Sequence, residues 1–134
     1  MVHAMSFHNG QAKYSNRFVR TKGLQAETEA GHALWAGIAA NPAKSEREGW
    51  GARGRMKDAS STDVVVHGGN ILSTFYMCGE GYILDPETLD TTGTAHWVPK
   101  EGISAHPKVD LATGDLLFFN YGKEAPYMHY GVVG

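Results

Sequence analysis

Residues 102–121 read GISAHPKVDLATGDLLFFNY, and this stretch indicates a β-hairpin that a constrained histidine precedes. The segments PKVD and DLLFFNY flank LATG, a connection rich in turn-forming residues, so they are predicted to pair as antiparallel strands. Pro107 follows His106 directly. It removes a backbone N–H donor and predicts an extended backbone at His106. Such rigidity suits a metal ligand, although the pattern alone leaves a purely structural role for His106 open.

Two further hairpins are predicted earlier in the chain. MVHAMSF and AKYSNRFVR flank a turn at Asn9-Gly10, the strongest short hairpin signal, and TDVVVH and ILSTFYM flank a second turn at GGN. YILD and YMHYGVV predict two more strands. Short antiparallel strands at regular spacing are typical of a sandwich, a barrel or a propeller. Because the successive strand groups are similar in size, an all-β propeller is favoured.

One segment departs from the strand pattern. The sequence LQAETEAGHALWAGIAAN places apolar residues on one face at helical spacing, so residues 24–40 are predicted to be helical and to end before Asn41-Pro42. The residues of this face are Ala26, Ala30, Leu34 and Ile38. A long polar loop, residues 42–61, follows. The helix and loop together predict an insertion at one end of a β scaffold, which either covers a site or packs on the flank.

Length and composition predict one folded domain over residues 1–134. The hydrophobic fraction of 42% argues against a disordered chain, and a net charge of −2 with both signs scattered argues against a nucleic-acid partner. No apolar run reaches the length of a membrane span, and nothing firm indicates membrane contact. The single cysteine, Cys78, excludes a disulfide framework and predicts a reducing, cytoplasmic setting. Cys78 is predicted to be a core thiol rather than a nucleophile, because no sequence neighbour would activate it.

The chain contains seven histidines, and none of them forms a pair at the spacing of a local metal site. His8, in a turn, and His32, on the predicted helix, are expected to be exposed. The strand residues His3, His67 and His129 are expected to be partly buried and hydrogen-bonded. The remaining two histidines are His96 and His106. The chain also lacks GxSxG, P-loop, CxxC, HExxH and Rossmann motifs.

Residues 102–121 resemble the first iron-ligand motif of the carotenoid cleavage oxygenases, the family of the retinal pigment epithelial membrane protein and of the lignostilbene dioxygenases. The resemblance extends to MVHAMSFHNGQAKYSNRFVRTKG, to SSTDVVVHGGNILSTFYMCGEGYILDPETLDTTG and to NYGKEAPYMHYGVV, in the family's order. GHALWAGIAANPAKSEREG is more similar to the bacterial lignostilbene-type branch than to the plant branch. Strand-like patterns at both ends predict that residues 1–134 are a partial carotenoid oxygenase domain, incomplete at both ends, with Met1 an internal methionine.

The resemblance implies a fragment of a seven-bladed β-propeller with one helical insertion and a non-haem Fe(II) on the propeller axis. Four histidines hold that iron in the family, and the SAHPK motif carries His106 over as the first ligand. The other three ligands are expected outside this chain, so the isolated fragment is expected to be inactive. The implied activity is oxidative cleavage, with O2, of a double bond in a carotenoid, apocarotenoid or stilbenoid, giving two carbonyl products. The implied partners are therefore O2 and a small apolar alkene.

Two positions depart from the family pattern. Met77 stands where members often carry a glutamate that orients another iron histidine, and Glu80 is offset from that position. Tyr76 stands where stilbene-cleaving members carry a lysine that holds the substrate phenol. The tyrosine puts a 4-hydroxystilbene substrate in doubt, although its hydroxyl is able to hydrogen-bond a phenol or an apocarotenoid end group. A non-enzymatic propeller segment that binds a ligand or a partner remains the alternative, and a propeller hydrolase with a Ca²⁺ or Zn²⁺ site is a lesser one.

Overall fold

The computed structural model describes residues 1–49, 55–122 and 124–134, which form three antiparallel sheets and one α-helix. The strands are β1 (Val2–His8), β2 (Gln11–Arg17), β3 (Asp63–His67), β4 (Asn70–Thr74), β5 (Tyr82–Leu84), β6 (Thr91–Thr94), β7 (Lys108–Val109), β8 (Leu116–Tyr121) and β9 (Met128–Val133). The first sheet is β1-β2, the second is β3-β4-β5-β6 and the third is β7-β8-β9. The predicted all-β class with one helical insertion is confirmed, and strand order in each sheet follows chain order.

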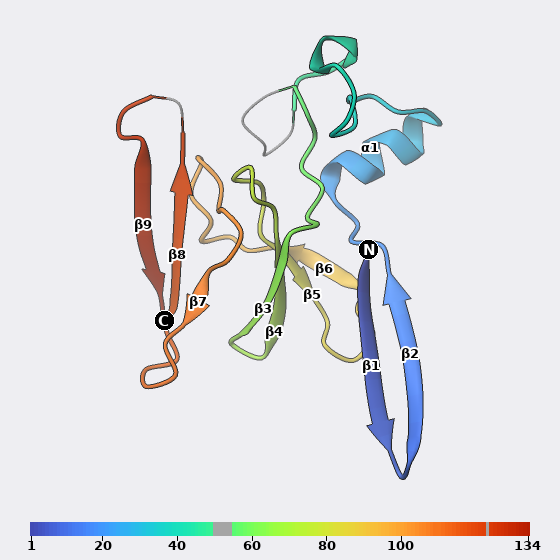
Figure 1. Ribbon diagram of the computed structural model, residues 1–134, viewed down its shortest axis with the longest axis vertical. Helices are drawn as coiled ribbons and strands as arrows, with labels where there is room; N and C mark the ends of the chain where they lie inside the picture. Colours follow the sequence, from blue (N-terminus) through green and yellow to red (C-terminus); the bar gives the residue numbers. More distant parts are fainter. Residues whose placement is uncertain (50–54, 123) are drawn as a thin grey trace.

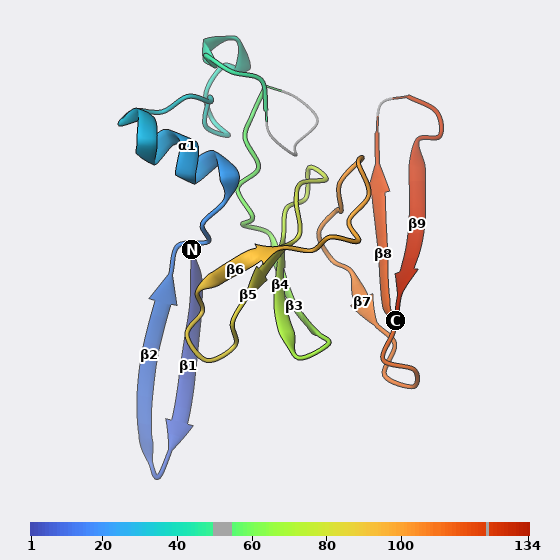
Figure 2. The same cartoon turned by 180° about the vertical axis from the view of Figure 1, so that it is seen from behind.

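The three sheets lie side by side, with β3–β6 in the middle (Figure 1). The β1-β2 hairpin flanks one side of the middle sheet and the β7–β9 sheet flanks the other, as the view from behind also shows (Figure 2). The helix α1 (Lys22–Ala30) and the segment that follows it lie together beyond one end of the sheets. This arrangement agrees with the predicted insertion at one end of a β scaffold.

The first two predicted hairpins are confirmed, and their turns have the expected chemistry. Asn9 and Gly10 have φ values of 47° and 73°, and the strand partners His8 and Gln11 close the turn. Gly68-Gly69 repeats this pattern in the β3-β4 hairpin, with φ values of 55° and 76°. Two successive positive φ values define a type I′ turn, whose twist matches that of paired strands. Glycine and asparagine tolerate this backbone, which is why the sequence signal was reliable here.

The other strands deviate in length from their sequence patterns. The strand predicted to reach Met77 ends at Thr74, so Phe75, Tyr76 and Met77 belong to the β4-β5 connection. In the third hairpin, β7 has only two residues, paired with Leu116 and Leu117. The strand β6 was not predicted, because its sequence TTGT carries no apolar alternation.

The predicted helix over 24–40 is wrong beyond residue 30. Thr21 caps the N-terminus of α1, its Oγ1 accepting the Leu24 N–H at 3.0 Å. Gly31 ends the helix with a φ of 73°, and its N–H donates to the Glu27 carbonyl. The apolar face expected to continue to Ile38 does not form, and Ile38 is 73% exposed. No helix in the described ranges is long and apolar enough to cross a membrane.

Glu27 explains why the chain turns back after α1. One of its carboxylate oxygens accepts the backbone N–H groups of Leu34 and Trp35, at 3.1 and 3.4 Å, and the other pairs with the Lys57 ammonium. Burial opposes the charge, but Lys57 and the two backbone donors outweigh it and lower the pKa of Glu27. Leu34 and Trp35 are consequently buried without being helical.

Apolar side chains fill both junctions between neighbouring sheets. The first cluster joins the β1-β2 hairpin and its following residues to the middle sheet, and the second joins the middle sheet to the β7–β9 sheet. The buried members of the first are Val2, Val19, Tyr82, Leu84 and Leu89. Those of the second are Leu72, Ala95, Ile103, Leu116 and Phe118. Packing of successive sheets through such junctions is how a propeller holds its blades together.

Two turns with the same hydrogen bonds recur in successive sheets. In Asp85–Asp90 and in Asp110–Asp115, the first aspartate's N–H donates to the last one's carbonyl, at 2.9 and 2.8 Å. Each turn has a positive φ at its fifth residue, 64° at Leu89 and 84° at Gly114. The first aspartate's carboxylate accepts backbone N–H groups in both turns. This repeat supports a propeller-type fold, although the two sequences, DPETLD and DLATGD, are not closely alike.

Candidate metal-ligand site

His106 is the one exposed residue in a run of buried ones. Residues 102–105 and Pro107 are buried, whereas 64% of the His106 side chain is accessible. The segment before β7 thus presents a single imidazole. The predicted extended backbone is wrong, however, because His106 has a φ of 65°, in the left-handed region. Pro107 disfavours the right-handed helical region for its predecessor, and at His106 the chain satisfies that restriction with a positive φ instead.

The segment carrying His106 is fixed on both sides by backbone bonds. Ile103 N–H donates to the Gly79 carbonyl at 3.0 Å, and Ser104 N–H donates to the Phe119 carbonyl at 2.9 Å. The fully buried Asn120 donates its side-chain Nδ2 to the Gly102 carbonyl at 2.8 Å. The residues before His106 are therefore held between the middle sheet's β4-β5 connection and β8.

The side chain of His106 faces a carboxylate of a different sheet. Its Nδ1 lies 3.4 Å from Oδ2 of Asp63, the first residue of β3. The other carboxylate oxygen of Asp63 accepts the Val64 N–H at 2.9 Å. Sequence reasoning did not pair these two residues, because strands of different sheets give no pairing signal in the sequence.

Tyr76 lies beside the His106 segment. Its carbonyl accepts a hydrogen bond from the Ser104 hydroxyl at 3.4 Å and another from the Tyr121 hydroxyl. Its N–H donates to Thr62 Oγ1 at 3.2 Å. Within the described residues the Tyr76 hydroxyl makes no hydrogen bond, and the residue is 36% exposed. Of the neighbouring residues, Met77 is half-buried and Glu80 pairs with Lys22 at 2.8 Å.

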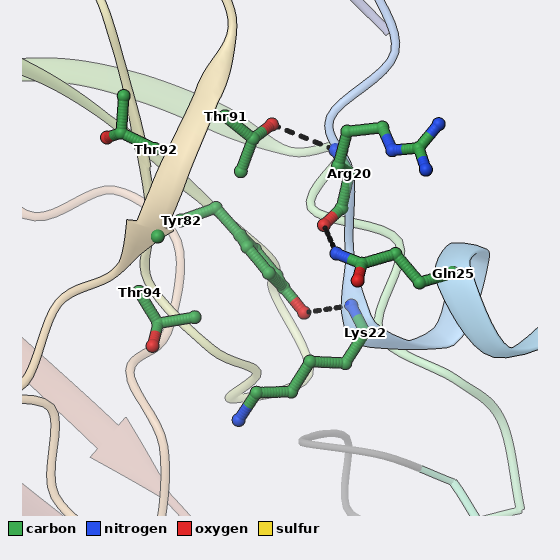
Figure 3. A pocket seen from close by; sticks show the side chains of 8 residues that line it. Arg20, Lys22, Gln25, Tyr82, Thr91, Thr92 and Thr94 are labelled. Carbon is green, nitrogen blue, oxygen red and sulfur yellow. Dashed lines mark hydrogen bonds between the residues drawn. The ribbon is translucent and has the colours of Figure 1, made fainter.

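An apolar hollow of about 200 Å³ lies next to the same connection. Phe75, next to Tyr76 in the chain, lines it together with Ile38 and Met56 from the insertion. A larger hollow, of about 340 Å³, lies at the start of α1 and is polar. There the Tyr82 hydroxyl accepts the Lys22 N–H at 3.0 Å, and Thr91 Oγ1 accepts the Arg20 N–H at 2.9 Å (Figure 3). These bonds join α1 to β5 and β6, so the second hollow is a structural junction.

The other histidines follow their predictions only in part. His8 is exposed as predicted, and so is His32, although His32 lies just after the helix rather than on it. His129 is half-buried, with its Nδ1 2.8 Å from Asn120 Oδ1. His3 bonds to the Tyr14 hydroxyl but is exposed, and half-buried His67 makes no hydrogen bond to any described residue.

No group of three or more His, Cys, Asp or Glu side chains gathers around a possible metal position in residues 1–49, 55–122 and 124–134. The cysteine does not alter this. Cys78 is fully buried, accepts the Tyr121 N–H at 3.2 Å and has the character of the predicted core thiol.

Asp58 is a buried carboxyl that the sequence did not indicate. It is 1% exposed, its Oδ2 accepts the Glu80 N–H at 3.1 Å, and its Oδ1 has no partner among the described residues. Burial raises the pKa of Asp58 from 3.8 to about 6; the Glu80 N–H opposes this rise and the Glu80 charge adds to it. Because the folded protein holds this proton more tightly, stability falls as the pH rises from about 4 to about 6.

Asp58→Asn in the intact protein is expected to remove that loss. At about pH 8 the free energy of unfolding should rise by about 1–3 kcal/mol, since no buried charge remains. At about pH 3 the variant and the wild type should be nearly equal, since Asp58 is then mostly neutral in both the folded and the unfolded state. Thermal melts at both pH values check this, and an equal effect at both would show that the charge of Asp58 is not the cause.

The sequence of the chain is similar to those of known proteins. The family described as retinal pigment epithelial membrane protein matches residues 1–134. An isoeugenol monooxygenase of Pseudomonas nitroreducens is 33% identical over 139 residues, covering 99% of this chain and 28% of the relative. A resveratrol cleavage oxygenase 1 of Chaetomium globosum is 33% identical over 123 residues, covering 90% of this chain and 20% of the relative.

A solved structure shows the same fold. The lignostilbene dioxygenase of Pseudomonas brassicacearum superposes with a TM-score of 0.71 at 26% identity, covering 89% of this chain and 24% of that one. In fold and in sequence the chain is thus similar to a class of oxygenases. The chain belongs to the retinal pigment epithelial membrane protein family. It spans about a quarter of the length of the relatives it matches.

Proposed function

We propose that this chain is a segment of a seven-bladed β-propeller that holds a non-haem Fe(II) and cleaves a carbon–carbon double bond with O2, giving two carbonyl products. The observation that carries the proposal is the exposed imidazole of His106, presented by an otherwise buried and hydrogen-bonded segment. Three further histidines, from the rest of the intact protein, complete the ligand set.

The donor chemistry at His106 fits Fe(II). A neutral imidazole is a good ligand for this ion, and the neighbouring carboxylate of Asp63 lies toward Nδ1, which leaves Nε2 as the atom for the metal. When bound, the iron supplies the redox chemistry of O2 activation. The chain contributes the position of one ligand and part of the surroundings of the substrate.

We propose a phenol-bearing alkene, of the stilbenoid or phenylpropene type, ahead of a carotenoid. Two relatives and the matched structure carry names of enzymes that act on such aryl alkenes. The free hydroxyl of Tyr76 is suited to hydrogen-bond a phenol. The neighbouring hollow at Phe75 and Ile38 is apolar, so an aromatic ring is a suitable occupant.

The intact protein tests this proposal. It is purified aerobically and its iron content is measured by elemental analysis. It is then incubated with resveratrol, isoeugenol and β-carotene, and the carbonyl products are identified by mass spectrometry. The expected result is about one iron per chain and cleavage of an aryl alkene. A protein without iron that cleaves none of them would favour the non-enzymatic alternative.

A further inference from the structure

We propose that Asp63 is a positioning residue for His106. In this role its carboxylate accepts the Nδ1 proton of the imidazole and directs Nε2 toward the metal. The inference rests on the proposed function, in which His106 binds iron, and adds a residue of the neighbouring sheet to that site. Asp63 does not touch the metal or the substrate in this role.

The orientation of the Asp63 carboxylate is set by its own strand. Oδ1 accepts the Val64 N–H at 2.9 Å, and Asp63 is paired with Thr74 at the end of the β3-β4 ladder. Asp63 is also the less exposed partner, with 26% of its side chain accessible against 64% for His106. With Oδ1 engaged and the backbone fixed, Oδ2 is the oxygen that faces the imidazole.

The separation leaves room for a hydrogen bond without any change of backbone. His106 Nδ1 and Asp63 Oδ2 are 3.4 Å apart, a few tenths of an ångström longer than a usual N–H···O bond. A small rotation of the exposed imidazole shortens this distance. The contact joins the start of β3 to the segment before β7, so it sets His106 relative to the middle sheet as well as to its own.

Such a bond decides which ring nitrogen is available. A neutral imidazole carries one proton, and a carboxylate at Nδ1 keeps that proton there, because a carboxylate accepts and does not donate. The lone pair of Nε2 is then free for the metal. Without Asp63 the imidazole is free to rotate and to carry its proton on either nitrogen.

The substitution Asp63→Asn tests whether the carboxylate orients the His106 imidazole or only packs beside it. The amide oxygen keeps the Val64 N–H bond, so the amide NH2 takes the place of Oδ2 and faces Nδ1 of His106. An NH2 group donates, which favours the tautomer with the proton on Nε2, the wrong one for a metal ligand. Asp63→Asn is thus expected to be as harmful as Asp63→Ala, even though it is the closest replacement in shape.

The test uses the intact protein and two readouts that do not depend on turnover. Fe(II) affinity is measured by competition with a chelator, and the visible spectrum of the Co(II)-substituted protein reports ligand geometry. Both Asp63 variants are expected to bind Fe(II) about 10–100-fold more weakly and to show an altered Co(II) spectrum. Asp90→Asn is the matched control: it also removes a carboxylate, which pairs with Arg17 at an exposed site, and it should behave like the wild type.

The outcomes separate the two proposals. If His106→Ala leaves Fe(II) affinity unchanged, the proposed function itself is wrong. If His106→Ala loses the metal while Asp63→Asn stays within about twofold of the wild type with an unchanged Co(II) spectrum, only the role of Asp63 is wrong. Thermal melts show that the variants are folded, and Asp63→Asn, which keeps the Val64 bond, carries the test if Asp63→Ala does not fold.

Discussion

Alanine at position 106 is expected to empty the metal site of the intact protein and to abolish alkene cleavage. His106 supplies one of four proposed iron ligands, and the loss of a direct ligand should weaken Fe(II) binding by more than the about 10–100-fold that is typical of an outer partner. The fold should survive, because 64% of this side chain is exposed and its burial contributes little. Iron content by elemental analysis and product formation from the aryl alkenes measure the result.

His67→Ala is the control for this substitution. Unlike His106, His67 lies on a strand, at the end of β3; it is half-buried and makes no hydrogen bond to a described residue. Its replacement should retain iron and turnover and change stability by less than about 1 kcal/mol. Full iron and normal turnover in His106→Ala would refute the assignment. Loss of iron in a folded His67→Ala protein would show that the wrong histidine was chosen.

The parts of the fold that could be predicted are those with a local cause. The turns at Asn9-Gly10 and Gly68-Gly69 require positive φ values, and glycine and asparagine at these positions identify them in the sequence. Strand alternation on either side then fixes the pairing. The end of α1 also has a local cause, since Gly31 is a favourable helix C-cap, but the apolar spacing that continues to Ile38 concealed it.

The parts that could not be predicted depend on contacts between distant residues. Glu27 holds Leu34 and Trp35 through a carboxylate that is fixed by Lys57, and no periodicity expresses such an anchor. Similarly, the sequence motif identified His106, but no sequence pattern indicated its neighbour Asp63, because Asp63 belongs to another sheet. The sequence thus indicated the candidate ligand but not the group that orients it.

Gly102→Ala is the substitution with the largest expected effect on stability. Gly102 has a φ of 84°, and a Cβ there would lie 2.7 Å from the carbonyl carbon of Cys78 and 2.9 Å from the carbonyl oxygen of Gly79. Both are backbone atoms, so no side-chain rotation relieves the clash. Separating the segments would break the Ile103–Gly79 hydrogen bond and displace the Gly102 carbonyl from Asn120. A loss of about 3–5 kcal/mol of stability is expected.

Gly114→Ala isolates the cause, because Gly114 has the same φ of 84° but no atom within 4 Å of the position that an added methyl group would take. It should lose only the about 1–2 kcal/mol of a left-handed alanine. Thermal melts of the two intact variants give the comparison, and equal losses would show that backbone strain alone is responsible. Since Gly102 lies at the start of the buried segment that ends at His106, its variant should also lose iron, whereas Gly114→Ala should retain it. Close backbone contact at Gly102 would then be what places the imidazole of His106 at the junction of the two sheets.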